Sequence, residues 1–269
     1  SRGLGDVYKR QNYGVEDLVE IVKLLRAPGG CPWDAEQTHE SIKKNFIEET
    51  YEVVEAINKK DNSMLLEELG DVLLQVVFHT EMEREKGGFT LSDVADGICK
   101  KLIERHPHVF GTVEVSSTDE VLSNWDDIKK KTKGQKSQTQ SMLSVPREFP
   151  ALMRAQKIQH KAAKVGFDWD NADGAFDKLT EEVSELKEAM AEKNTDHVFE
   201  EMGDVLFSAV NISRFAGCDA EEALTGATDK FLERFSKVEA LAAEKGIDMK
   251  TAGIEKLDEL WNEAKTSEK

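Results

Sequence analysis

The chain has 269 residues, of which 39% are hydrophobic, and its formal net charge at pH 7 is -17. This length suffices for one large domain or two ordinary ones, and the negative charge repels phosphate backbones, so nucleic acids are not expected partners. The longest apolar runs are far shorter than the roughly 20 residues that span a membrane, and three scattered cysteines suit a reducing compartment, so we expect a cytoplasmic protein without a membrane partner.

Helical periodicity runs through most of the chain. The first eleven residues share no pattern with the rest, and we interpret residues 1–11 as a non-native or disordered leader. From about residue 12, apolar residues recur at spacings of three and four, and turn signals such as APGG, NKKDNS and EKGG separate the segments. The stretch 130–141 has no apolar residue, which predicts a polar linker between helical domains at 12–129 and 142–269. The predicted fold class is all-α.

The two domains carry the same acidic pattern. Six carboxylates recur in the second domain at one constant offset and without a gap: Glu48, Glu49, Glu52, Glu55, Glu68 and Asp71 become Glu181, Glu182, Glu185, Glu188, Glu201 and Asp204. Further along the chain, a basic pair recurs at a slightly shorter offset, so that Lys101 and Arg105 become Lys230 and Arg234. We infer that a unit of roughly 110 residues has been duplicated, with two long helices and two or three shorter ones in each copy.

Helical geometry predicts that these carboxylates gather. Residues three apart share a helix face, so Glu49 and Glu52 project side by side, and so do Glu68 and Asp71. The turns between the helices are short, which favours antiparallel packing, and the expected N-cap is Ser63 in the first domain and either Thr195 or Asp196 in the second. Four carboxylates then meet in each domain, where a hard cation such as Mg²⁺ or Mn²⁺ would neutralise them.

The alternative for any single EExxE motif is a solvated helix face, which is the commoner situation. Here, however, the motif occurs twice in register, and residues 46–57 and 65–76 contain no Lys or Arg that would pair with the acids. The acidic charge is therefore interpreted as a binding site for a cation.

Three other features receive structural interpretations. His106 and His108 flank a proline, and without a third ligand nearby we expect helix-end packing rather than zinc binding. Glu36 and His39 form a single ExxH motif, whereas a di-iron bundle needs two, so no di-iron site is expected. Core positions are expected for three tryptophans, because this side chain buries a large area where helices meet: Trp33, Trp125 and Trp169.

EExxE followed by ExxD in paired helices resembles the MazG nucleoside triphosphate pyrophosphohydrolases of the all-α NTP pyrophosphatase group. The resemblance covers nearly the whole chain from about residue 12, and it includes the duplication and the motifs GGCPWD, RHPHVFG, KVGFDWD and LDELWNEAK. It implies a homodimer of four-helix-bundle-like units that hydrolyses a nucleoside triphosphate, with Mg²⁺, to the monophosphate and pyrophosphate. We expect the enzyme to accept nucleotides with many different bases.

The resemblance also assigns residues to roles. The implied metal ligands are Glu182, Glu185, Glu201 and Asp204, with Glu49, Glu52, Glu68 and Asp71 as counterparts in the first domain. The implied phosphate clamp is Lys230 and Arg234, with Lys101 and Arg105 as counterparts. The implied nucleotide contacts are Lys178 and Trp261.

The expected reaction is an in-line attack of water on the α phosphorus, with Mg²⁺ and the clamp neutralising the charge of the leaving pyrophosphate. Glu181, adjacent to the ligand Glu182, is a candidate proton acceptor. The second domain is favoured as the principal active site because the resemblance points there and because the first domain has four extra residues between Asp71 and Lys101. A structural or weaker catalytic role is expected for the first domain.

Two alternatives stay open on the sequence. A narrower pyrophosphatase acting on dUTP, dCTP or a phosphoribosyl nucleotide would use the same metal cage with a different base pocket. A non-catalytic protein would instead present the acidic grooves to a basic partner, but that role does not require the basic pair to recur.

Overall fold

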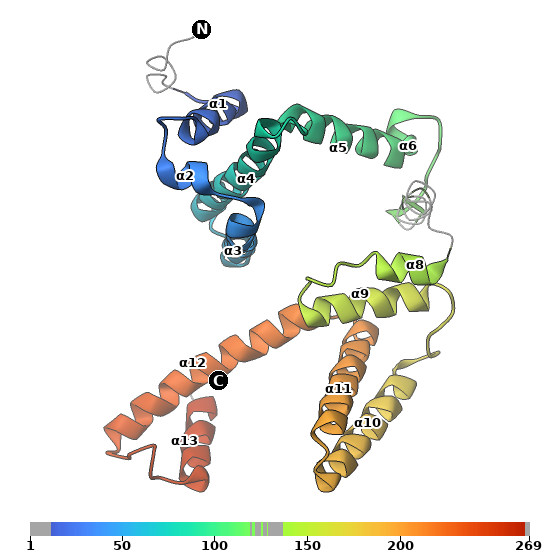
Figure 1. Cartoon of the computed structure of the whole chain (residues 1–269). Helices are drawn as coiled ribbons and strands as arrows, with labels where there is room; N and C mark the ends of the chain where they lie inside the picture. Colours follow the sequence, from blue (N-terminus) through green and yellow to red (C-terminus); the bar gives the residue numbers. More distant parts are fainter. Residues whose placement is uncertain (1–11, 119, 122–124, 126–127, 129–136, 267–269) are drawn as a thin grey trace. The chain divides into compact units, whose positions relative to one another are not determined.

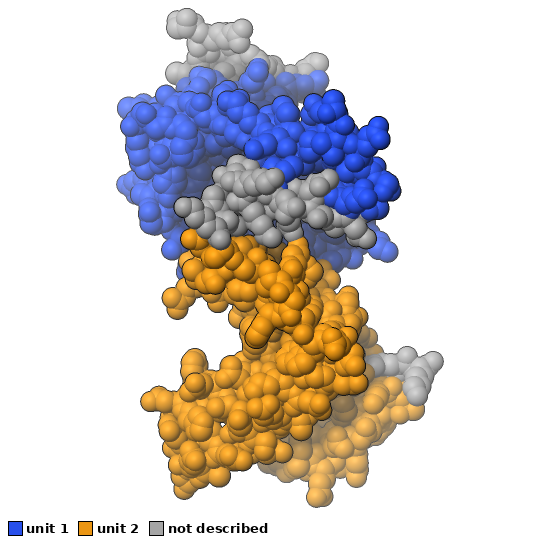
Figure 2. Space-filling view, turned by 90° about the vertical axis from the view of Figure 1, so that its right-hand side faces the viewer, with its two compact units in different colours: residues 1–129 blue, residues 130–269 orange. Residues whose placement is uncertain are grey.

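Every element of the described structure is a helix. The computed structural model describes residues 12–118, 120, 121, 125, 128 and 137–266 (Figure 1). No strand occurs among these residues, which confirms the all-α fold class. The chain divides into two compact units, residues 1–129 and 130–269, which are coloured separately in Figure 2. Within the described residues, no helix is long and apolar enough to cross a membrane.

The first unit is built around a pair of long helices. Its helices are α1 (Val15–Arg26), α2 (Pro32–Glu36), α3 (His39–Lys59), α4 (Asn62–Glu85), α5 (Leu91–Arg105) and α6 (Pro107–Phe110). Helices α1, α3 and α4 supply the buried apolar core, which consists of Val22, Ile42, Val77, Phe78 and Met82. This core lies at the end of the α3–α4 pair where α3 begins and α4 ends.

The second unit repeats the long helical pair. Its helices are α8 (Gln138–Leu143), α9 (Ala151–Ala163), α10 (Ala172–Glu192), α11 (Thr195–Phe215), α12 (Ala220–Glu244) and α13 (Ile254–Thr266). Figure 1 shows α10 and α11 side by side, while α12 runs away from them with α13 packed on its far half. A buried apolar cluster joins α12 to α13 and consists of Val238, Ala242, Leu260 and Ala264.

The turns of the two helical pairs are structurally equivalent. Lys60 and Lys193, which correspond in the duplicated pattern, both adopt the left-handed conformation, with φ of 55° and 57°. The N-caps are Asp61 and Asn194, whose side-chain oxygens accept hydrogen bonds from backbone N–H groups of the next helix. The predicted caps Ser63, Thr195 and Asp196 were therefore wrong, because each lies inside the helix that it was expected to begin. The duplicated antiparallel hairpin itself is confirmed.

The four extra residues of the first unit lengthen one helix and one turn. Helix α4 has 24 residues and its equivalent α11 has 21, which accounts for three of them. The fourth lies in the turn, since five residues separate α4 from α5 and four separate α11 from α12. The insertion therefore lies beyond the acidic motifs, between them and Lys101.

Part of the predicted linker is helical. Residues 130–136 lie outside the described part of the chain, but α8 begins at Gln138, after the N-cap Ser137. Gln138 donates a hydrogen bond to the carbonyl of Lys161, and the ammonium of Lys161 lies 2.6 Å from the hydroxyl of the buried Ser141. Polar contacts to α9 hold the start of this short helix, so the absence of apolar residues from 130–141 did not predict it.

Candidate functional site

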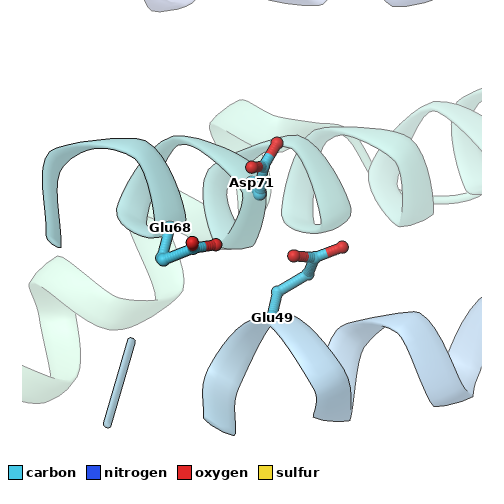
Figure 3. A group of neighbouring side chains, drawn as sticks. All are labelled: Glu49, Glu68 and Asp71. Carbon is cyan, nitrogen blue, oxygen red and sulfur yellow. The ribbon is translucent and has the colours of Figure 1, made fainter. Parts of the chain in front are cut away.

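The first unit brings three of its predicted metal ligands together. Glu49 on α3 and Glu68 and Asp71 on α4 point toward one another, and one carboxylate oxygen of each lies within 4.8 Å of the others (Figure 3). Burial raises the pKa of Glu49, and the charges of Asp71 and Glu52 raise it further. Burial also raises the pKa of Glu68, followed by the charge of Glu52 and a hydrogen bond to it. Glu52 therefore lies beside the other three acids, and the four predicted residues form one group.

The second unit has the equivalent group. Oxygens of Glu182, Glu201 and Asp204 lie within 4.8 Å of one another. Glu182 and Glu201 are only 5% and 9% exposed, so their charges are largely withdrawn from water. Burial raises the pKa of Glu185, and the charges of Glu182 and Glu201 raise it further, which places this fourth acid next to the group. We call these four residues the second-unit acidic cage, and Glu49, Glu52, Glu68 and Asp71 the first-unit acidic cage.

The chemistry of the second-unit acidic cage fits a divalent cation. The Oε2 atom of Glu201 is buried and has no hydrogen-bond partner among the described residues. A buried carboxylate oxygen without a partner is costly, and a cation would satisfy it. An all-carboxylate donor set is the kind that Mg²⁺ and Mn²⁺ prefer.

Two basic side chains distinguish the second-unit cage. The ammonium of Lys178 lies 2.7 Å from Glu182 and 3.0 Å from Glu181, and hydrogen bonds to these acids raise the pKa of Lys178 above its usual range. The imidazole of His197 lies 3.2 Å from Glu201. The equivalent positions of the first unit, in the register of the acidic pattern, hold Asn45 and Met64. Neither residue is basic, so at these two positions only the second-unit cage is contacted by basic side chains.

The predicted phosphate clamp forms a separate group on α12 and α13. Arg234 stacks over the ring of Trp261, with its guanidinium carbon 5.0 Å from the ring centroid, and Phe231 also contacts this ring. Lys230 lies one turn before Arg234 on α12 and is exposed. Because α12 diverges from the α10–α11 pair (Figure 1), the described part of one chain does not bring this group to the second-unit cage.

The counterpart pair in the first unit lies on α5. Lys101 is exposed, whereas the Nε atom of Arg105 is buried without a hydrogen-bond partner among the described residues. Helix α5 continues away from the end of α4 rather than folding back along the α3–α4 pair (Figure 1). Both units therefore separate their carboxylates from their basic pair.

The tryptophan prediction was wrong. Trp33, Trp125 and Trp169 are 62%, 40% and 42% exposed, so none is a core anchor within this chain. Trp33 belongs to the five-residue helix α2, which buries none of its residues and offers no core to enter. The prediction for His106 fits the structure, since this residue caps the end of α5 and its Nδ1 atom lies 2.7 Å from the carbonyl of Leu102.

Sequence reasoning missed a histidine cluster in the first unit. The Nδ1 atoms of His39 and His79 lie 2.7 Å apart, and the Nε2 atom of His39 lies 2.7 Å from Glu83. Burial lowers the pKa of His79, and His39 lowers it further. His79 and Glu83 are four residues apart on α4, a spacing that would have marked them as neighbours on one face.

Comparison with known proteins gives concordant matches to both units. The family described as the MazG nucleotide pyrophosphohydrolase domain matches residues 37–110 and 173–239. The nucleoside triphosphate pyrophosphohydrolase/pyrophosphatase MazG of Thermotoga maritima is 49% identical over 93% of this chain and 95% of that protein. The nucleoside triphosphate pyrophosphohydrolase of Escherichia coli is 43% identical over 94% of this chain and 98% of that protein. The uncharacterized protein YabN of Bacillus subtilis is 47% identical over 93% of this chain and 51% of that protein.

Proposed function

We infer the activity from the family, because this chain belongs to the MazG nucleotide pyrophosphohydrolase family. The chain hydrolyses nucleoside triphosphates to the monophosphate and pyrophosphate. The observation that carries this proposal is the acidic cage, which recurs in both family-matched segments and contains a buried carboxylate oxygen without a partner in the second. A polyphosphate is the substrate class that such a cation site serves.

Glu182, Glu185, Glu201 and Asp204 are the proposed ligands of a divalent cation, with Mg²⁺ as the expected ion and Mn²⁺ as a substitute. A cation held there supplies charge neutralisation for the phosphates and acidifies a water molecule. The protein's own contribution is to hold four carboxylates on two helices joined by a short turn. Burial raises the pKa of Glu185, and the charges of Glu182 and Glu201 raise it further, so a cation at the cage would relieve an unfavourable concentration of negative charge.

Two residues next to the cage have proposed roles in the reaction. Lys178, paired with Glu182 and Glu181, is one helical turn from the cage and can exchange a carboxylate for a phosphate oxygen when the nucleotide binds. Glu181 is the proposed proton acceptor, since its side chain is 55% exposed and stands outside the cage, where it can reach a water. The water then attacks the α phosphorus and pyrophosphate leaves.

A second copy of the chain is proposed to complete the site. The proposed phosphate clamp lies on α12, which diverges from the helices of the cage, and we propose that another molecule supplies it. Large apolar side chains also stand exposed on these helices, which is unusual for an isolated protein. On α11 and α12 they are 44% to 84% exposed: Phe199, Leu206, Phe207, Phe231 and Leu232. A homodimer would bury these faces and bring the clamp of one copy to the cage of the other.

Mixing two inactive variants tests this shared site. Glu201→Gln removes a cage ligand and Lys230→Ala removes a clamp residue, so neither variant alone should turn over nucleotide. After subunit exchange, we expect about a quarter of the parent activity, because half of the dimers are mixed and each of these holds one intact site. No recovery, with mixed dimers confirmed by affinity tags, would place the clamp and the cage in the same chain.

Product analysis tests the function itself. The protein is incubated with each common ribo- and deoxyribonucleoside triphosphate, with Mg²⁺ or with EDTA. We expect monophosphate and pyrophosphate from many bases, and only with the metal. Turnover of a single base would indicate a narrower pyrophosphatase, and diphosphate with phosphate would contradict the proposed bond cleavage. No hydrolysis of any triphosphate would favour a non-catalytic acidic binding protein.

A further inference from the structure

His197 contacts the second-unit acidic cage from outside it. It lies in the first turn of α11, where its backbone N–H donates to the N-cap Asn194. Its Nε2 atom lies 3.2 Å from Oε1 of Glu201, one turn further along the same helix, and its Nδ1 atom lies 3.3 Å from Oε2 of Glu192, at the end of α10. The imidazole therefore bridges the hairpin turn and one ligand of the cage.

The two oxygens of Glu201 have different environments. Oε1 contacts His197, whereas Oε2 is buried and has no hydrogen-bond partner among the described residues. Rotation of this carboxylate would cost the contact with His197, so the imidazole fixes which oxygen is left for the cation. Side chains that orient metal ligands in this way contribute strongly to metal affinity.

We propose that His197 is a positioning residue, which holds Glu201 so that Oε2 is presented to the divalent cation of the second-unit cage. The proposal rests on the proposed function only in that the cage binds a cation. The first unit has no equivalent histidine, because Met64 occupies the position of His197. Lys59 occupies the position of Glu192. The two cages therefore differ in how firmly one of their ligands is held.

A purely structural role for His197 is the main alternative, in which its contact with Glu192 closes the turn between α10 and α11. The two roles use different nitrogen atoms, so they can be separated by substitution. Glu192→Gln alters the contact that closes the turn and leaves Glu201 untouched. His197→Ala removes both contacts, and His197→Gln keeps a side-chain amide that can donate to Glu201 across the same i, i+4 spacing.

The test is a calorimetric titration of the full chain with Mn²⁺ alone, in a Glu68→Gln background that disables the first-unit cage. We expect His197→Ala to weaken Mn²⁺ binding by roughly 10- to 100-fold. His197→Gln should recover most of the affinity, and Glu192→Gln should leave it unchanged. Met64→Ala is the matched control, since it truncates the equivalent helix position without touching the second-unit cage, and it should also leave the affinity unchanged.

Unchanged Mn²⁺ affinity in His197→Ala would overturn the proposal. So would an equal loss of affinity in Glu192→Gln, particularly if both variants lower the melting temperature by the same amount, because that pattern belongs to a turn-closing residue. Failure of the proposed function has a different signature. If no triphosphate is hydrolysed but Mn²⁺ affinity follows the expected order, the positioning role of His197 stands without the enzymatic activity.

Discussion

The ammonium of Lys178 lies 2.7 Å from a carboxylate oxygen of Glu182, a residue that is only 5% exposed. This contact partly neutralises the second-unit acidic cage in the absence of a cation. We expect Lys178→Met to lower the melting temperature in EDTA and saturating Mg²⁺ to restore most of the loss, because the metal replaces the missing positive charge. Differential scanning calorimetry with and without Mg²⁺ measures this. An equal loss in both conditions would mean that Lys178 acts only through packing.

Glu201→Gln should lower kcat by about 100-fold or more, since it removes the charge of one of the proposed ligands of the cation. Helicity should not change, because Gln has a similar size and helix propensity. Steady-state rates and circular dichroism test the two parts. Turnover near the parent rate would remove Glu201 from the active site. The matched first-unit variant, Glu68→Gln, should have a much smaller effect if the second unit is the principal site.

Arg234→Lys should lower kcat/KM by about 10-fold or more, because lysine keeps the charge but cannot grip two phosphate oxygens at once. The same substitution should change the fluorescence of Trp261, whose ring Arg234 covers at 5.0 Å. Arg105→Lys is the matched change in the first unit. An equal loss of kcat/KM in that variant would show that both units turn over substrate.

The histidine pair of the first unit predicts a pH dependence of stability. The pKa of His79 is lowered in the folded chain, first by burial, so the unfolded chain binds its proton more readily. The contribution of His79 to the free energy of unfolding is therefore present at neutral pH and is lost as the pH falls below the unfolded value of 6.5. His79→Ile, which introduces the residue of the equivalent second-unit position, should flatten this dependence between pH 7.5 and about 5.5. The same change of melting temperature with pH in the parent protein and in His79→Ile would contradict this prediction.

The grouping of the acidic residues could be predicted from the sequence, because it depends on spacing along two neighbouring helices. The constant register of the acidic pattern placed Glu182, Glu201 and Asp204 together, because helical periodicity and a short turn decide where such residues point. The N-caps were missed by one or two residues, since Asp61 and Asn194 follow a left-handed lysine that the pattern does not mark.

Features that depend on tertiary packing were harder to predict from the sequence. The direction in which α12 leaves the α10–α11 pair is encoded by no spacing along the chain (Figure 1). Trp33 is exposed because its short helix has no apolar partner in this chain. His197 was overlooked because one histidine near an acidic motif carries little information until its two nitrogens are seen to contact Glu192 and Glu201.

The most direct test of the central claim is phosphorus NMR of ATP hydrolysis by the Mg²⁺-loaded protein in ¹⁸O-labelled water. We predict AMP and pyrophosphate as products, with the label on the phosphate of AMP, because water attacks the α phosphorus. Label in the pyrophosphate would mean attack on the β phosphorus. Formation of ADP and phosphate, or no turnover at all, would contradict the proposed pyrophosphohydrolase activity.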